Sequence, residues 1–328
     1  VEVRPRFPVR LPRGGGGDGV MRVRKGVLDR LLHVGSSPVR VRIWPAREGI
    51  RLRAEPVEPS HVVHVLGDVE ATPAGDEQLE LAIERMRFAL ALDDDMGEFF
   101  KAFSRDELLG AVIHRMPWVR PRRRPWPWEA LAWAITEQLI ESPRARAIQR
   151  RITRRWGPTI RPAGSSTSRP LPAGSAAGSL LRDVPSAALI AGRAPAELAS
   201  MDLTEARSLA LVRCAREVAA GRADLSDPDS DKRLLAIREI GPWTVQCLGN
   251  HGRGDPDSLP AGDLAYVKLV GHLAGLGRRA TVEEVEEYFA PYAPWRALAG
   301  TFALAGLRKL ASRGGPLARA PERERWAA

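Results

Sequence analysis

Residues 237–273 read IREIGPWTVQCLGNHGRGDPDSLPAGDLAYVKLVGHL, and the fold and the function depend on this stretch. A helix-like run stops at the Gly241–Pro242 pair, and a second helix opens around Trp243. A polar loop follows, and Asp263 then stands at the start of a third helix. One tryptophan and one aspartate therefore each lie beside a tight turn.

The first turn joins two helices through only a few residues, with Gly241 where the chain must reverse. We expect a positive φ at this glycine and a close approach of its backbone to a neighbour. The N–H groups exposed at the start of the second helix would form an anion site of phosphate size. An ordinary αα-hairpin in a helical bundle has the same pattern, so this segment alone leaves both interpretations open.

Asp263 occupies the predicted N-cap of the third helix, a position that aspartate favours for structural reasons alone. Capping and chemistry are compatible there, because the positive end of the helix dipole stabilises a negative carboxylate. An ionised carboxylate can stabilise a developing cation, or it can orient and deprotonate a water molecule.

The composition favours a polyanionic partner. The chain has 328 residues, 44% of them hydrophobic, and it carries a net charge of +10 with a pI of about 10.4. Clustered basic side chains bind phosphates with release of counterions. Only five of the 50 basic residues are lysine, a bias that genome composition can also produce, so a merely basic surface is the alternative.

Two cysteines, Cys214 and Cys247, exclude a four-cysteine iron–sulfur or zinc site and a disulfide framework. No apolar run approaches the roughly 18 residues that a membrane span needs, and the N-terminal residues lack the apolar core of a signal peptide. These features predict a protein without a membrane partner, cytoplasmic and associated with the nucleoid.

The pattern changes along the chain from strand-like to helical. Residues 38–44 and 49–55 alternate apolar and basic side chains and predict a β-hairpin, so residues 1–76 are expected to form a small α/β domain with an antiparallel sheet. Within it, GVLDRLLHV is a short helix or strand, and HVVHVLGDVE is a candidate strand. Residues 77–312 have helical periodicity and are expected to form the helical region. The composition predicts a flexible surface insertion at 161–179 and a mobile tail at 313–328.

The hairpin followed by LPAGD resembles the helix–hairpin–helix DNA glycosylase superfamily, and in particular its 3-methyladenine DNA glycosylase II branch. Three further segments are similar to that branch: PWEALAWAITEQLIESPRARAIQRRI, LASMDLTEARSLALVRCAREVAAGRADL and YAPWRALAGTFALAGL. The likeness covers most of residues 20–312. It implies a mainly α fold, in which the helical glycosylase region is preceded by a small mixed α/β domain.

The resemblance assigns roles to two residues of the opening stretch. Asp263 matches the catalytic aspartate of the superfamily, and Trp243 stands where bifunctional members carry a Schiff-base lysine. The absence of an amine there implies a monofunctional enzyme without AP lyase activity. Trp243 would stack on the flipped, electron-poor base with a cation–π contribution. A buried core tryptophan of the hairpin is the structural alternative.

Other matching positions concern the DNA. Leu139 corresponds to the apolar wedge that fills the stack vacated by the flipped nucleotide, although a core leucine has the same sequence pattern. Gln138 beside it would support the loop, and Gly241 and Thr244 of the hairpin would bind the backbone.

Two positions depart from the family pattern. Glu239 occupies the first glycine position of the usual G-x-G hairpin, and an acid near a DNA phosphate should weaken that contact. Leu304 stands where a relative has a second base-stacking tryptophan. Together with Cys247, this suggests a less aromatic base site and leaves the substrate range open.

The resemblance therefore implies a monofunctional DNA N-glycosylase that flips and excises alkylated purines of the 3-methyladenine type in base excision repair. It would bind damaged double-stranded DNA as a monomer, with no cofactor and no metal. Two alternatives stay open: a relative that binds damaged DNA without chemistry, and a monofunctional glycosylase for another base lesion. The acidic run at 93–95 could hold a metal ion, but its position before MGEFFKAF favours a helix cap instead.

Overall fold

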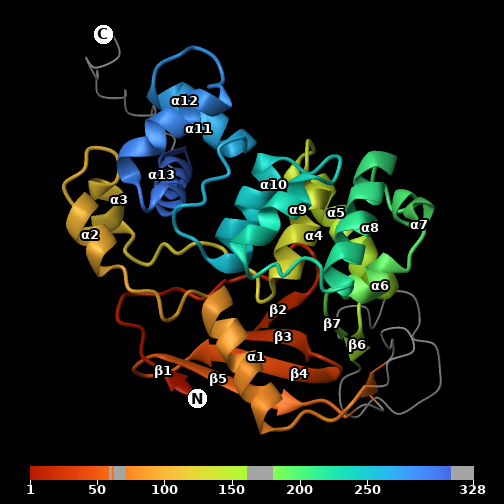
Figure 1. Ribbon diagram of the computed structural model, residues 1–328. Helices are drawn as coiled ribbons and strands as arrows, with labels where there is room; N and C mark the ends of the chain where they lie inside the picture. The colour runs from red at the N-terminus through yellow and green to blue at the C-terminus, as the bar shows by residue number, and fades with distance from the viewer. Residues whose placement is uncertain (59–60, 63–70, 161–179, 312–328) are drawn as a thin grey trace.

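The computed structural model describes residues 1–58, 61–62, 71–160 and 180–311 (Figure 1). Most of the candidate strand at 61–70, the insertion at 161–179 and the tail at 313–328 lie outside the described residues. The predicted fold class is confirmed, since a small antiparallel sheet precedes a region built almost wholly from helices (Figure 1).

Five antiparallel strands form the sheet, in the order β1-β5-β4-β3-β2. Their bounds are β1 (Glu2–Val3), β2 (Met21–Arg24), β3 (Val27–Val34), β4 (Ser37–Pro45) and β5 (Ile50–Pro56). The predicted hairpin is the β4–β5 pair, in which Trp44 lies opposite Arg51. GVLDRLLHV is a strand, and its lack of alternation follows from burial on both faces: Leu32 joins the core beneath α1, whereas Leu31 packs with Ile160 and Leu181.

Helix α1 (Asp76–Ala89) lies across one face of this sheet (Figure 1). Its Ala82 and Met86 share a core with the sheet residues Leu28, Val41 and Leu52. The domain boundary expected at residue 76 marks the start of helical periodicity. The core that the sheet shares with α1 extends across this boundary.

Two groups of helices make up most of the remaining residues that the structure describes. The first group packs around one core and comprises α4 (Pro127–Glu137), α5 (Ser142–Trp156), α6 (Ala187–Ala191), α7 (Pro195–Ala199), α8 (Glu205–Ala219), α9 (Asp231–Leu235) and α10 (Pro242–Cys247). Short strands β6 (Thr159–Ile160) and β7 (Leu181–Arg182) connect it to the sheet, where β3 lies against β7.

The second group has a separate core that is rich in aromatic side chains. It comprises α2 (Gly97–Phe103), α3 (Gly110–Arg115), α11 (Leu264–Leu273), α12 (Val282–Phe289) and α13 (Arg296–Ala311). The ring centroids of Phe99 in α2 and Phe302 in α13 are 5.2 Å apart, so this contact joins segments about two hundred positions apart in the sequence. The chain crosses between the two groups at a π-helical segment, η3 (Leu248–Arg253), and the loop that follows it.

Helix α4 lies at the centre of the first group, and every residue from Glu129 to Thr136 is buried (Figure 1). A buried carboxylate requires a partner, and Glu129 has two. Arg30 of β3 lies 2.8 Å from Glu129 Oε2, and Arg124 lies 3.2 Å from Glu129 Oε1.

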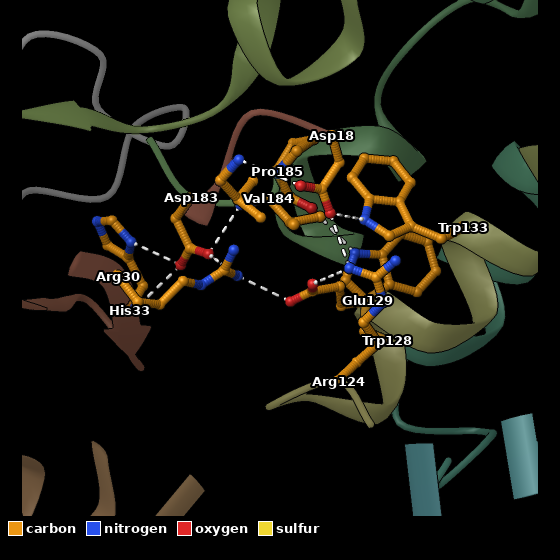
Figure 2. Close-up of polar contacts among 11 residues, drawn as sticks. Asp18, Arg30, His33, Arg124, Trp128, Glu129, Trp133, Asp183, Val184 and Pro185 are labelled. Atoms are coloured by element: carbon orange, nitrogen blue, oxygen red, sulfur yellow. Dashed lines mark hydrogen bonds and ion pairs between the residues drawn. The ribbon is translucent and has the colours of Figure 1, made fainter. Parts of the chain in front are cut away.

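The same cluster continues into β3 and the loop after β7 (Figure 2). Arg30 also pairs with Asp183 at 2.9 Å, and Asp183 accepts a hydrogen bond from the backbone N–H of His33. On the other side, Arg124 pairs with Asp18, which accepts a second hydrogen bond from the indole of Trp133. The cluster therefore links the sheet to α4 through buried charges.

The pKa values of the two carboxylates that pair with Arg124, Glu129 and Asp18, shift in opposite directions. Burial raises the pKa of Glu129, against the lowering effect of Arg30 and Arg124. Burial would also raise the pKa of Asp18, but the positive charges of Arg124 and Arg30 outweigh it and lower that pKa. Removal of Arg124 would leave the carboxylates of Asp18 and Glu129 buried without the cation that they share.

The acidic run at 93–95 has structural partners. Asp95 Oδ1 accepts the N–H of Gly97, the first residue of α2, although the N-cap position itself is Met96, and Asp94 pairs with Arg123. Within the described parts of the chain, no three His, Cys, Asp or Glu side chains are grouped to hold a metal ion. None of the helices that the structure describes is long and apolar enough to cross a membrane.

We expect Arg30→Met to lower the free energy of unfolding by about 3–5 kcal/mol, because Glu129 and Asp183 would keep buried charges without their shared cation. Chemical denaturation measures this change. The matched control is Arg42→Met on the neighbouring strand, whose pair with Glu55 is partly exposed, with an expected loss below about 1 kcal/mol. Equal losses in the two variants would contradict a special role for the buried cluster.

Candidate active site

The hairpin forms at α9 and α10, as the sequence predicts, but its strained position differs from the expected one. Gly241 has φ −113° and ψ −180°, which is extended backbone, and a Cβ there would meet nothing within 4 Å. The positive φ, 76°, belongs to Glu239 instead. The expectation for Gly241 was therefore wrong, and Glu239 adopts a conformation that glycine favours.

The loop between α4 and α5 carries Leu139. Its φ is 54°, and its side chain is fully exposed, at 102%. A leucine held in the left-handed region and pointing into solvent gains nothing from core packing. The core alternative for Leu139 is thus wrong, and the side chain is available to an external partner.

Gln138 ties this loop to the hairpin. Its Nε2 donates to the carbonyl of Glu239 at 2.7 Å and to Oγ1 of Thr244 at 2.9 Å. Thr244 itself is buried. Both predicted residues are therefore brought together, and the side chain of Gln138 is hydrogen-bonded to the side chain of Thr244 and to the hairpin backbone.

Trp243 lies beside the backbone just before Asp263. A Cβ added at Gly262 would be 3.7 Å from Trp243 Cδ1 and 3.9 Å from Trp243 Cβ. The tryptophan is half-buried and is not a member of the core clusters found among the described residues. The fold thus brings the hairpin tryptophan close to the backbone next to the aspartate, although the two residues are twenty positions apart in sequence.

The carboxylate of Asp263 is held at the start of α11. Its Oδ1 accepts the N–H of Ala265 at 2.7 Å, so it forms the predicted N-cap. The preceding loop is anchored to both helical groups: Ser258 donates to the carbonyl of Gln246 in α10, and Asp257 pairs with Arg296 of α13. Asp263 is half-buried, so the carboxylate is fixed without being sealed from solvent.

Two buried titratable groups that the sequence did not single out as catalytic, Cys247 and His251, interact electrostatically with Asp263. Burial, and then the negative charges of Asp263 and Glu137, raise the pKa of the Cys247 thiol well above its usual value. Burial lowers the pKa of His251, although its hydrogen bond to the carbonyl of Arg122 and the charge of Asp263 oppose this. Both pKa shifts favour the neutral thiol of Cys247 and the neutral imidazole of His251 at neutral pH.

Leu304, the second departure from the family pattern, lies on α13 and packs against the second core. The arginine-rich segment at 120–128 is also largely engaged within the protein: Arg123 and Arg124 form ion pairs, and Trp128 donates to the carbonyl of Pro185. These arginines are thus structural.

No family model matches the chain. The chain is 25% identical over 214 residues to a DNA-3-methyladenine glycosylase of Bacillus subtilis, an alignment covering 63% of this chain and 66% of the relative. It is 28% identical over 252 residues to a probable bifunctional transcriptional activator/DNA repair enzyme AlkA of Mycobacterium tuberculosis, covering 71% and 46%. The chain thus spans less than two thirds of the length of these relatives.

Solved structures share the fold. A 3-methyladenine DNA-glycosylase from Archaeoglobus fulgidus superposes with a TM-score of 0.73 at 18% identity, covering 94% of this chain and 98% of that one. An 8-oxoguanine glycosylase/lyase from Clostridium acetobutylicum, solved with double-stranded DNA, gives 0.63 at 14% identity, covering 90% and 89%. Both likenesses extend over the sheet and both helical groups. These structures show a shared fold, and the sequence relatives support the resemblance of this chain to the helix–hairpin–helix DNA glycosylase superfamily and its 3-methyladenine branch.

Proposed function

We propose that the protein is a monofunctional DNA N-glycosylase that excises alkylated purines of the 3-methyladenine type. The observation that carries the proposal is the indole of Trp243 packed beside Gly262, next to the fixed carboxylate of Asp263. An aromatic face suits a flipped cationic base, and a carboxylate suits the cationic sugar that the base leaves behind. Trp243 supplies no amine, so no Schiff base forms at that position.

The chemistry needs a single carboxylate. The electron pair of the breaking N-glycosidic bond stays on the purine, whose alkylation already provides the positive charge that this pair neutralises. The sugar becomes an oxocarbenium-like cation, which Asp263 stabilises by its negative charge. Water then adds to C1′, and its proton passes to Asp263 or to solvent.

Binding would use the exposed features around the hairpin. Leu139 enters the stack as the base leaves it, which buries an apolar side chain that is otherwise in water. Gln138 and Thr244 hold the loop and the hairpin in register, and Gly241 lets the backbone of the hairpin approach the DNA. One protein molecule on double-stranded DNA, without cofactor or metal, is the complete unit in this proposal.

A damaged-DNA-binding protein without chemistry is the second candidate, and Glu239 is the observation that favours it. Its carboxylate lies in the hairpin, where its ion pair with Arg238 is 3.5 Å long and largely exposed. A negative charge there opposes close approach of a phosphate. A glycosylase for another base lesion shares the rest of the argument, and only the released base distinguishes it.

We expect Asp263→Asn to slow base release by about 10²- to 10⁴-fold, because an amide can neither stabilise the sugar cation by charge nor accept a proton. The measurement is release of 3-methyladenine from duplex DNA treated with dimethyl sulfate. Asp257→Asn is not a suitable control, because it breaks the loop anchor. The control is Asp227→Asn, because Asp227 accepts the backbone N–H of Asp229 before α9 and an asparagine can keep that hydrogen bond.

Wild-type protein that binds the methylated duplex without releasing any base would support the second candidate instead. Release of only a different damaged base would keep the mechanism and change the substrate.

Leu139→Ala should leave the free energy of unfolding within about 0.5 kcal/mol of wild type, because the side chain has no contacts to lose. Base release from duplex DNA should nevertheless fall by about tenfold or more, since the emptied stack is no longer filled. A large loss of stability, or unchanged release, would contradict the wedge assignment.

Two substitutions at Glu239 separate charge from backbone conformation. Glu239→Gln removes the charge and keeps the strain of a positive φ, whereas Glu239→Gly removes both. We expect both variants to bind undamaged duplex more tightly than wild type at low salt, by about two- to fivefold, with the gain disappearing at high salt. Titration of labelled duplex at two salt concentrations measures this, and equal affinity of all three proteins would mean that Glu239 does not face a phosphate.

A further inference from the structure

Arg207 of α8 is a buried cation directed at the far end of α4. Only 7% of the residue is exposed. Its Nη1 donates to the carbonyl of Gln138 at 3.0 Å and to that of Thr136 at 3.3 Å, and its Nε donates to Thr204 Oγ1 at 2.9 Å. Among the described residues it forms no ion pair with a carboxylate.

This arrangement is unusual for an arginine. Burial lowers the pKa of Arg207, followed by the nearby charge of Arg144, so the position opposes the charge that it holds. The compensation comes from the last carbonyls of α4, which lack partners within the helix and form the negative end of its dipole. A guanidinium is well suited to bridge two such carbonyls because its donors are fixed in a plane.

The loop that Arg207 reaches is the one that carries Leu139. Gln138 is held at two points: its carbonyl by Arg207 from inside, and its side-chain amide by Glu239 and Thr244 of the hairpin. Leu139 follows immediately, with a positive φ and no packing of its own. The direction of the leucine is therefore set by the contacts of its neighbour.

We propose that Arg207 is a positioning residue that holds the end of α4 so that Leu139 enters the DNA stack at the right place. The proposal rests on the function proposed above for Leu139. Arg207 touches neither DNA nor the reacting atoms, and its effect passes through the carbonyls of Thr136 and Gln138. A residue that only stabilised the packing of α8 on α4 would affect the amount of folded protein, but would not change what a folded molecule does at the stack.

The test uses the full chain carrying Arg207→Gln, with Arg207→Lys as the variant that keeps the charge. Arg216→Gln is the matched control, since Arg216 lies on the same helix and also donates to a carbonyl, that of Ala191. The first readout is single-turnover release of 3-methyladenine from methylated duplex. The second needs no chemistry: a duplex with a tetrahydrofuran abasic site opposite 2-aminopurine, whose fluorescence reports unstacking when an apolar side chain enters.

We expect Arg207→Gln to slow release by about 10- to 100-fold, as small misplacements of positioning groups do. The fluorescence change should be lost to the same extent as in Leu139→Ala. The double variant should be no worse than either single variant, because both act on one event. Arg207→Lys should recover part of both signals, because it keeps the charge but lacks the planar donors, and Arg216→Gln should match wild type.

The inference is overturned if folded Arg207→Gln retains the wild-type fluorescence change, or if its defect adds fully to that of Leu139→Ala. If Arg207→Gln does not fold, Arg207→Lys provides the test. Complete loss of the fluorescence change in folded Arg207→Lys, with Leu139 still present, overturns the account based on charge. Wild-type protein that releases no base contradicts the proposed function alone, and the fluorescence comparison then still decides the role of Arg207.

Discussion

The buried ion pair between Arg30 of the sheet and Glu129 of α4 is the interaction on which the rest of the arrangement depends (Figure 2). An unpaired charge at either residue would be costly, so β3 and the first turn of α4 must stay together. This fixes the start of a helix that is buried on all sides. The other end of α4 is held by Arg207 and leads directly into the loop that contains Gln138 and Leu139.

Fixed geometry at both ends of α4 explains how a small site can be built from distant segments. Gln138 links the end of α4 to the hairpin through its hydrogen bond to Thr244. The hairpin in turn places Trp243 against the loop that ends at Asp263. That loop is anchored to α10 and to α13, so the carboxylate lies where the two helical groups meet. The proposed glycosylase activity would require such rigidity, because the aromatic surface and the carboxylate would act on the base and the sugar of one nucleotide.

Sequence reasoning predicted the parts of this site that follow from local rules. Aspartate at a helix start, alternation in the β4–β5 hairpin and the Gly-Pro stop before Trp243 each have a local cause. It failed where tertiary contacts decide. The positive φ lies at Glu239 rather than Gly241, and β3 lacks alternation because both its faces are covered. Arg207 was missed because one arginine among many on a helix carries no signal until its carbonyl partners are in place.

The most direct test of the account is the affinity of the protein for two abasic analogues in duplex DNA, one with a cationic pyrrolidine in place of the sugar and one with neutral tetrahydrofuran. An enzyme binds a mimic of its transition state more tightly than a neutral analogue of the same shape. If Asp263 serves the sugar cation, wild-type protein will bind the pyrrolidine duplex about a hundredfold or more tightly, and Asp263→Asn will lose this preference. Equal affinity of wild-type protein for both duplexes would contradict the account.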